Sequence, residues 1–125
     1  ERRIERVIRN LVVNAIEHAD GTRVTITVAT SATDVACRVR DRGVGMTQEV
    51  ADHVFDRFYR ADTARARTTG GTGLGLAIAT EDVAIHGGRL QAYGEPGRGA
   101  SFLMTLPKRA GEEIVSRPLA LWEDE

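Results

Sequence analysis

The sequence predicts an α+β fold of two layers, in which helices cover one face of a mixed β-sheet. Three observations support this prediction. Residues 4–19 carry apolar side chains at helical spacing, residues 23–41 and 89–106 each hold two alternating stretches, and a second helical stretch lies between these pairs. With 125 residues, the chain is long enough for one domain with its own core and too short for two.

The first helix is predicted from apolar residues that recur every three or four positions. The members of this stripe are Ile4, Val7, Ile8, Leu11, Val12, Ala15, Ile16 and Ala19, and we expect them to form one buried face. Asp20-Gly21 ends the helix.

Alternation over residues 23–29 (RVTITVA) and 35–41 (VACRVRD) predicts two antiparallel strands joined by a short polar link from Ser31 to Asp34. Residues 89–94 and 101–106 predict a second hairpin around the turn EPGRG, which Pro107 ends. A short helix is expected at about residues 48–54 and a mobile loop at 55–69.

A further helix is predicted over about residues 72–85, and His86-Gly87-Gly88 ends it because glycine adopts the left-handed cap conformation at little cost. Its expected buried residues are Leu74, Ile78, Val83 and Ile85. The domain is assigned to residues 1–107. Residues 108–125 show no convincing pattern and are interpreted as a tail that packs locally through Ile114, Leu119, Leu121 or Trp122.

The composition is that of an ordinary soluble protein, with 42% apolar residues, 28% charged residues and a formal net charge of -1. This balance argues against a nucleic-acid-binding protein. The sole cysteine, Cys37, cannot form an internal disulfide and is expected to be a packed strand residue. Because no apolar run approaches the roughly 18 residues of a membrane span, we expect a cytoplasmic domain without membrane insertion.

Two asparagines, Asn10 and Asn14, lie one turn apart at the margin of the apolar stripe, followed by Glu17 and His18. They could be surface amides. Alternatively, a carboxamide oxygen is a suitable neutral ligand for Mg²⁺ that otherwise keeps water and phosphate oxygens. The pair alone does not decide between these interpretations.

Asp41 ends a predicted strand and is followed by Gly43 and Gly45. The segment could be only a turn. In a binding site, the carboxylate would accept a hydrogen bond from an exocyclic amine, and Gly43 would let a flat base approach the backbone. Adenine has that amine, whereas guanine carries a carbonyl oxygen at the same position.

Residues 69–78 read TGGTGLGLAI, which could be a flexible hinge or a cradle for a phosphate chain at a helix start. No lysine follows as in a P-loop, and no short strand leads into it as in a dinucleotide-binding fingerprint. The preceding loop supplies basic residues that could face either phosphate or solvent, namely Arg57, Arg60, Arg65 and Arg67.

The chain carries, in order, the segments NLVVNAIEHA, DRGVGM, FDRFYRAD, GGTGLGLAI, HGG and GRGASFLMTLP. In this order and spacing they resemble the catalytic ATP-binding domain of bacterial two-component sensor histidine kinases, within the superfamily shared with the gyrase, Hsp90 and MutL ATPases. The resemblance covers residues 1–107. It implies a Bergerat-type two-layer α/β sandwich, a mixed sheet on about three helices, and ATP bound under a mobile lid at about residues 47–72.

The resemblance also implies roles for individual residues. Asn14 matches the Mg²⁺-binding asparagine of the N box, and Asn10 matches its partner one turn earlier. Asp41 matches the adenine-reading aspartate, with Gly43 and Gly45 completing the first glycine box. Further matches are the lid aromatics Phe55 and Phe58, the lid cations Arg60 and Arg65 near the terminal phosphates, and the second glycine box at Gly71, Thr72, Gly73, Leu74, Gly75 and Leu76.

One position departs from the family pattern. Where many members carry a basic residue three positions after the N-box asparagine, this chain has Glu17, so phosphate neutralisation would fall on Mg²⁺ and the lid arginines. His18 could assist in contacting the phosphates; the simpler interpretation is a histidine at the boundary of the buried helix face.

The family's ATP hydrolases resemble one another in a glutamate four residues before the N-box asparagine, where this chain has Asn10. Asparagine cannot act as a general base, so the resemblance favours phosphate transfer to a histidine on a separate dimerisation domain. His18, His53 and His86 do not lie in the phosphoacceptor context. The fragment is expected to be a monomer within a homodimeric, membrane-anchored kinase that serves a response regulator. The alternatives are a non-catalytic regulatory module of the degenerate-kinase or anti-sigma-like kind, and an ATP hydrolase.

Overall fold

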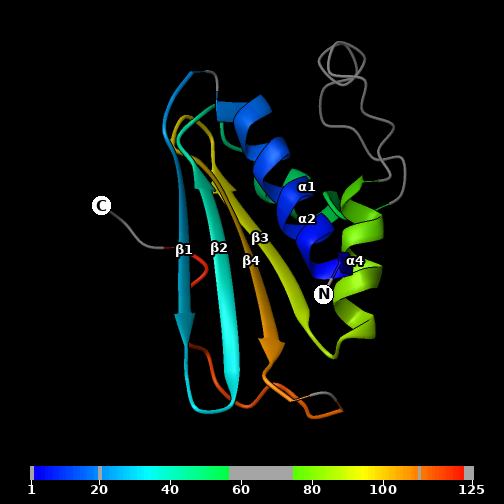
Figure 1. Cartoon of the computed structure of the whole chain (residues 1–125). Coiled ribbons are helices and arrows are strands. Elements are labelled where there is room, and N and C mark those ends of the chain that lie inside the picture. Colours follow the sequence, from blue (N-terminus) through cyan, green and yellow to red (C-terminus); the bar gives the residue numbers. More distant parts are fainter. Residues whose placement is uncertain (1, 20, 57–74, 110, 123–125) are drawn as a thin grey trace.

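The computed structural model describes residues 2–19, 21–56, 75–109 and 111–122, which form helices packed on one face of a sheet (Figure 1). The elements in chain order are α1 (Arg2–Ala19), β1 (Val24–Thr30), β2 (Asp34–Asp41), α2 (Gln48–His53), α4 (Gly75–Ile85), β3 (Arg89–Glu95) and β4 (Gly99–Pro107). The predicted α+β sandwich is therefore confirmed. Both predicted hairpins and the predicted helices are present, with the start of α4 at the limit of the described residues.

The sheet has the strand order β1-β2-β4-β3, and all three pairings are antiparallel. Within the described residues the sheet is thus antiparallel, and the expectation of a mixed sheet is wrong for them. The connection through α4 carries the chain to the far edge, so β3 is outermost and β4 returns beside β2 in the opposite direction. The second strands of the two hairpins form the centre of the sheet.

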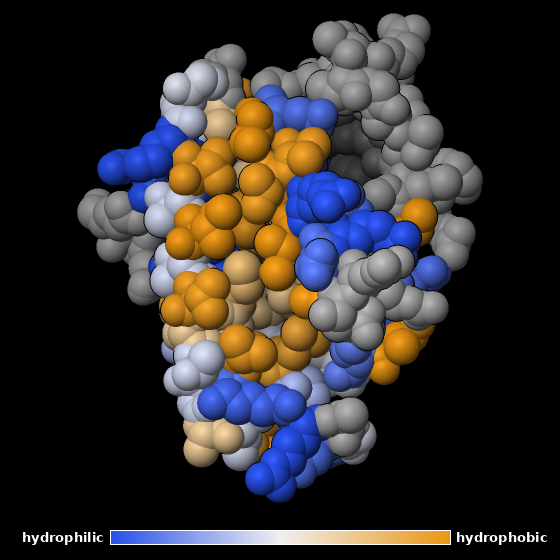
Figure 2. All heavy atoms as spheres, viewed as in Figure 1, coloured by the Kyte–Doolittle hydropathy of each residue, from blue (hydrophilic) through white to orange (hydrophobic). Residues whose placement is uncertain are grey.

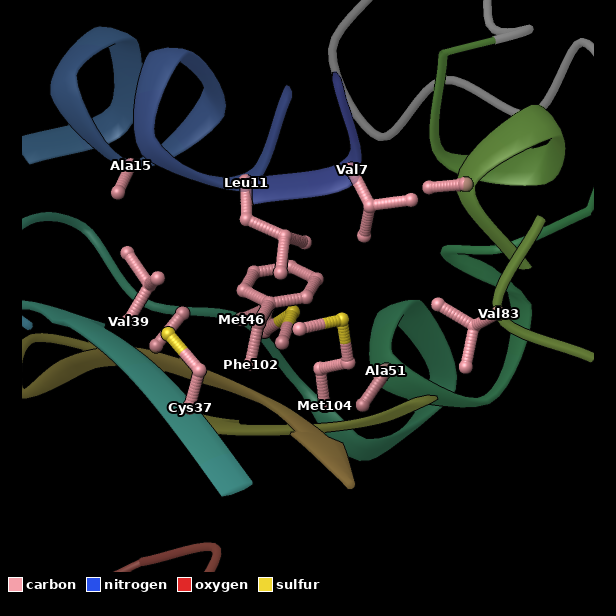
Figure 3. Packing of buried hydrophobic residues seen from close by; sticks show 12 residues of the cluster. Val7, Leu11, Ala15, Cys37, Val39, Met46, Ala51, Val83, Phe102 and Met104 are labelled. Atoms are coloured by element: carbon pink, nitrogen blue, oxygen red, sulfur yellow. The ribbon is translucent and has the colours of Figure 1, made fainter. Parts of the chain in front are cut away.

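The core lies between α1 and the helix-facing side of the sheet (Figure 3). Val7, Leu11 and Ala15 of α1 are fully buried over Val39 and Phe102, which pair with each other across β2 and β4. Cys37 is buried in the same cluster, as predicted, and burial raises the pKa of its thiol. One prediction fails here: Ile16 is 60% exposed although Ala15 and Ala19 on either side of it are buried, so it lies at the margin of the buried face of α1.

The helix α4 packs beside α1 through small side chains. Ala77 and Ala79 are buried together with the predicted Val83, whereas the predicted Ile78 and Ile85 are exposed. Alanines allow the two helices to approach closely, so the large isoleucines point away from the contact. The helix ends as predicted, with Gly87 at φ +76° and its N–H donating to the Ala84 carbonyl.

An apolar band runs where α1 and the edge strand β1 lie side by side (Figure 2). Ile26 and Val28 of β1 are paired with Val39 and Cys37, so their side chains point to the helix-covered face. They nevertheless remain 50% and 63% exposed, because α1 does not extend over this edge.

The other face of the sheet carries no helix among the described residues, yet much of it is buried. Ser101, Leu103 and Thr105 point to this face, opposite to Phe102 and Met104, and each is at most 3% exposed. Residues 111–122, which form no helix or strand, cross this face and contact it through Leu121 and Trp122. The predicted local packing of the tail is therefore confirmed for Trp122.

Candidate functional site

Asp41 at the end of β2 is 1% exposed, and only one of its two carboxylate oxygens has hydrogen-bond partners among the described residues; Asp34 is the other buried aspartate with one such oxygen. The Oδ1 of Asp41 accepts hydrogen bonds from the backbone N–H groups of Gly43 (2.9 Å) and Ala100 (3.3 Å). Its Oδ2 is buried and has no hydrogen-bond partner among the described residues. Leaving a buried carboxylate oxygen unpaired is costly, so this atom is suited to a donor on a ligand.

The loop after Asp41 is fixed against the end of α1. A Cβ added at Gly43 would overlap the carbonyl oxygen of His18. Glycine is therefore required at this position by the approach of the helix backbone; the predicted approach of a base stays a prediction. Gly45 has φ +76° and faces the Glu95 carbonyl in the same way, so both glycines hold the loop close to its neighbours.

Asn10 and Asn14 lie on α1, and both are partly buried. No hydrogen bond joins either side-chain amide to another residue that the structure describes, which leaves the amide oxygens available. His18 donates from Nδ1 to the carbonyl oxygen of Asn14, at 2.8 Å. This contact holds His18 to its own helix and supports the interpretation of a boundary histidine. Since His18 also contacts Gly43, the asparagine-bearing end of α1 adjoins the loop that follows Asp41.

The helix α4 runs antiparallel to α1 (Figure 1). Arg6 near the start of α1 forms an ion pair with Asp82 in the second half of α4, at 3.3 Å. Gly75 and Leu76, at the start of α4, are consequently directed toward the later turns of α1 that bear the asparagines. The predicted residues Phe58, Arg60, Arg65, Gly71, Thr72, Gly73 and Leu74 lie outside the described residues.

The chain that leads into residues 57–74 is anchored to the core. Thr47 caps α2 by accepting a hydrogen bond from the Val50 N–H at 3.3 Å, and Ala51 is buried. Phe55 then packs edge-on against Phe102, with ring centroids 6.0 Å apart and planes at 79°. The predicted F-box residue Phe55 therefore joins the start of the predicted lid to the centre of the sheet.

Sequence reasoning missed one participant in the site, the backbone of Ala100. Its N–H donates a hydrogen bond to Asp41 Oδ1. Every residue except proline has a backbone N–H, so the amino-acid sequence does not indicate which one makes this bond. The neighbouring Gly99, at φ +100°, could have indicated a close approach at this point. A Cβ there would overlap the Asp41 carbonyl oxygen.

A cavity of about 570 Å³ lies at the opposite end of the molecule, between the end of α4 and the start of the tail. Its lining includes Ile85, His86, Pro107, Lys108 and Ile114, and no predicted site residue contributes to it. Among the side chains that the structure describes, no group of three or more His, Cys, Asp or Glu could hold a metal ion. No described helix is both long and apolar enough to span a bilayer.

Comparison with known proteins matches residues 1–110 to the family described as "Histidine kinase-, DNA gyrase B-, and HSP90-like ATPase". The chain is 50% identical over 120 residues to the sensor histidine kinase MtrB of Mycobacterium tuberculosis (strain ATCC 25618 / H37Rv), a match that covers 96% of the chain and 21% of MtrB. It is 44% identical over 107 residues to the signal transduction histidine-protein kinase AfsQ2 of Streptomyces coelicolor, covering 86% of the chain and 20% of AfsQ2. The chain thus spans about a fifth of these relatives.

Two solved structures are similar in fold. Full-length ShkA in complex with AMPPNP superposes with a TM-score of 0.74 at 28% identity, covering 94% of the chain and 23% of ShkA. The mycobacterial sensor histidine kinase MprB gives a TM-score of 0.73 at 28% identity, covering 87% of the chain and 72% of that structure. The chain therefore belongs to the family of histidine kinase-, DNA gyrase B- and HSP90-like ATPases, and it is a domain of the sensor histidine kinase type.

Proposed function

We propose that the chain binds Mg-ATP and donates the γ-phosphate to a histidine on a separate dimerisation domain of a longer kinase. The observation that carries this proposal is the buried, unpartnered Oδ2 of Asp41. Its companion oxygen is held by two backbone donors, so the free oxygen is fixed in direction and can accept the exocyclic amine of adenine. The AMPPNP complex of the similar ShkA structure supports a nucleotide as the ligand.

The phosphates would extend from Asp41 toward the start of α4. Backbone N–H groups of residues 71–76 would face them at the positive end of the helix dipole, and Arg60 and Arg65 would neutralise the terminal phosphates. The partly buried amide of Asn14, unused by other described residues, would hold Mg²⁺. When bound, the ion would neutralise charge on the phosphate oxygens.

Phosphate transfer is favoured over hydrolysis because of Asn10, which occupies a position where a carboxylate could activate water. An amide has no basic site for that proton, whereas a neutral histidine acceptor needs no base from this domain. The relatives bear the name sensor histidine kinase, which supports the same choice. We further propose a homodimeric, membrane-anchored kinase with this domain in the cytoplasm, and a response regulator as the final acceptor.

The test joins this chain to the histidine-bearing segment of its own protein and supplies ATP labelled at the γ-phosphate. We expect acid-labile, base-stable label on protein histidine. Steady release of phosphate without labelled protein would indicate a hydrolase. Tight ATP binding with neither product would indicate the regulatory module, and no binding at all would contradict the proposal.

Asn14→Ala should remove most of the Mg²⁺ dependence of ATP binding. The alanine variant loses the amide oxygen but keeps a good helix residue, so α1 should fold normally. The measurement is calorimetric ATP titration with and without Mg²⁺. Val13→Ala, one position away and 47% exposed in the native chain, is the matched control and should respond to Mg²⁺ as the wild type does. An undiminished Mg²⁺ response in Asn14→Ala would reject the proposed ligand.

A further inference from the structure

The tail is held on the helix-free face of the sheet by an anchor at each end. At the first anchor, the fully buried Asp34 accepts hydrogen bonds through Oδ2 from the Val115 N–H (3.1 Å), the Ser116 N–H (2.8 Å) and the Ser116 hydroxyl (2.6 Å). The Ser116 hydroxyl is also the main cause of a lowered pKa for Asp34. Because the pKa of Asp34 is lowered, this anchor stabilises the folded state at every pH above the ordinary pKa of 3.8. That stability is lost only as the pH falls below 3.8 and through the lowered pKa of the folded state.

The second anchor is Trp122. Its ring lies over the Arg40 guanidinium, 3.7 Å from carbon to centroid, and meets the Tyr93 ring edge-on at 5.0 Å. The preceding backbone is bonded to the sheet, since Ser101 Oγ donates to the Leu121 carbonyl at 2.6 Å and Arg38 donates to the Ala120 carbonyl at 2.7 Å. The tail is therefore bound to the sheet at residues 115–116 and again at residues 120–122.

Arg40, under the Trp122 ring, is only 7% exposed and connects the tail to the site. Its Nε donates to the backbone carbonyl of Asp41 at 3.3 Å, and a terminal nitrogen donates to the Arg98 carbonyl at 3.2 Å. Arg40 thus ties the strand end that bears Asp41 to the turn between β3 and β4. The same turn reaches the loop after Asp41, because the Gly97 N–H donates to the Val44 carbonyl at 2.9 Å.

We propose that Trp122 and Arg40 are positioning residues for nucleotide binding. Docking of the tail on the helix-free face of the sheet and binding of a nucleotide to Asp41 on the helix-covered face would then favour each other. The coupling passes through the backbone of Asp41 and through the turn at residues 95–99. It rests on the proposed ATP site. The family match ends at residue 110, whereas the docked tail continues to Trp122. Because coupling between two sites is reciprocal, it can be measured from either side.

The chain provides its own probe, since Trp122 is its only tryptophan. Titration of the intact 125-residue chain with Mg-ATP should shift the Trp122 emission to shorter wavelength, with the same Kd as calorimetry gives. Mg-GTP absorbs similarly but lacks the amine that Asp41 would bind, and should leave the emission unchanged. Trp122→Ala should raise the Kd for ATP roughly tenfold, within the range usual for coupled sites.

Three variants separate positioning from a general loss of structure. Trp122→Phe keeps an aromatic face over Arg40 and should restore most of the affinity. Ser116→Ala weakens the distant anchor, so it should shift the Trp122 emission to longer wavelength without nucleotide and also raise the Kd. Val115→Ala removes a side chain that is 72% exposed and should behave as the wild type. Circular dichroism establishes that each variant is folded.

If the intact chain binds ATP but Trp122 emission does not respond and Trp122→Ala binds as tightly, the coupling is wrong and the proposed function stands. A Trp122→Phe variant as weak as Trp122→Ala would also contradict the aromatic contact as its cause. If the intact chain binds no ATP, the proposed function and the coupling fall together.

Discussion

Asp41→Asn is expected to weaken ATP binding by about 3 kcal/mol, or roughly a hundredfold in Kd, while the domain stays folded. Two backbone N–H groups point at Oδ1, so the asparagine must place its oxygen there to satisfy them. Its NH₂ group then takes the place of Oδ2 and faces the amine of adenine, donor against donor. The substitution therefore reverses one polar atom and preserves the bonds that hold the loop.

The same reversal should change base preference. Guanine carries a carbonyl oxygen where adenine carries the amine, so the NH₂ group of Asp41→Asn can donate to it. Calorimetric titration with ATP and GTP measures both effects, and thermal unfolding establishes that the variant is folded. Asp52→Asn, on the exposed side of α2, is the control and should leave both affinities unchanged. An ATP affinity equal to that of the native chain would show that Asp41 does not read the base.

Phe102→Ala should lower the free energy of unfolding by about 3–5 kcal/mol, a large part of the 5–15 kcal/mol typical of a domain. Phe102 is 2% exposed at the centre of β4, where it packs in the core cluster (Figure 3). Its ring also contacts the Phe55 ring. Its removal leaves a cavity that the surrounding strands cannot close. The melting temperature should fall by roughly 10–20 °C, measured by calorimetry or circular dichroism.

Ile16→Ala is the matched control, because it removes a comparable apolar side chain from a position that is 60% exposed. We expect a change within about 0.5 kcal/mol. A double-mutant cycle of Phe102→Leu with Phe55→Leu should then give a coupling of about 0.5–1.5 kcal/mol for the edge-on contact. Equal losses for Phe102→Ala and Ile16→Ala would contradict the assignment of the core.

The arrangement of elements could be predicted because local patterns determine it. Alternation located both hairpins, and the helical period located α1, since each pattern reflects one buried face. The exposure of single apolar residues on these helices was not predictable, as Ile16, Ile78 and Ile85 show. Whether such a residue is covered depends on which side of its helix packs against the neighbouring elements, and a periodic pattern does not specify that side exactly.

The side chains of the candidate site could be predicted from the sequence, but the backbone groups that hold them could not. Asp41 was identified from its place at a strand end, but the burial of its Oδ2 and the contribution of Ala100 depend on a pairing between distant strands. Asp34 was interpreted only as part of a polar link, although it is fully buried and anchors the tail. Its partners follow some eighty residues later, beyond the reach of local patterns.

The central pairing of β2 with β4 has a consequence for folding. Each hairpin closes over a few residues, whereas Asp41 and Ala100 are 59 positions apart, so joining the hairpins closes a far longer loop. The Asp41 carboxylate is held in place only after β2 has paired with β4. A chain with both hairpins formed but β2 not paired with β4 would have near-native local structure and no binding site for the ligand. Ligand binding would therefore indicate that folding is complete. Because the ligand binds only the native state, it would also shift the folding equilibrium toward that state.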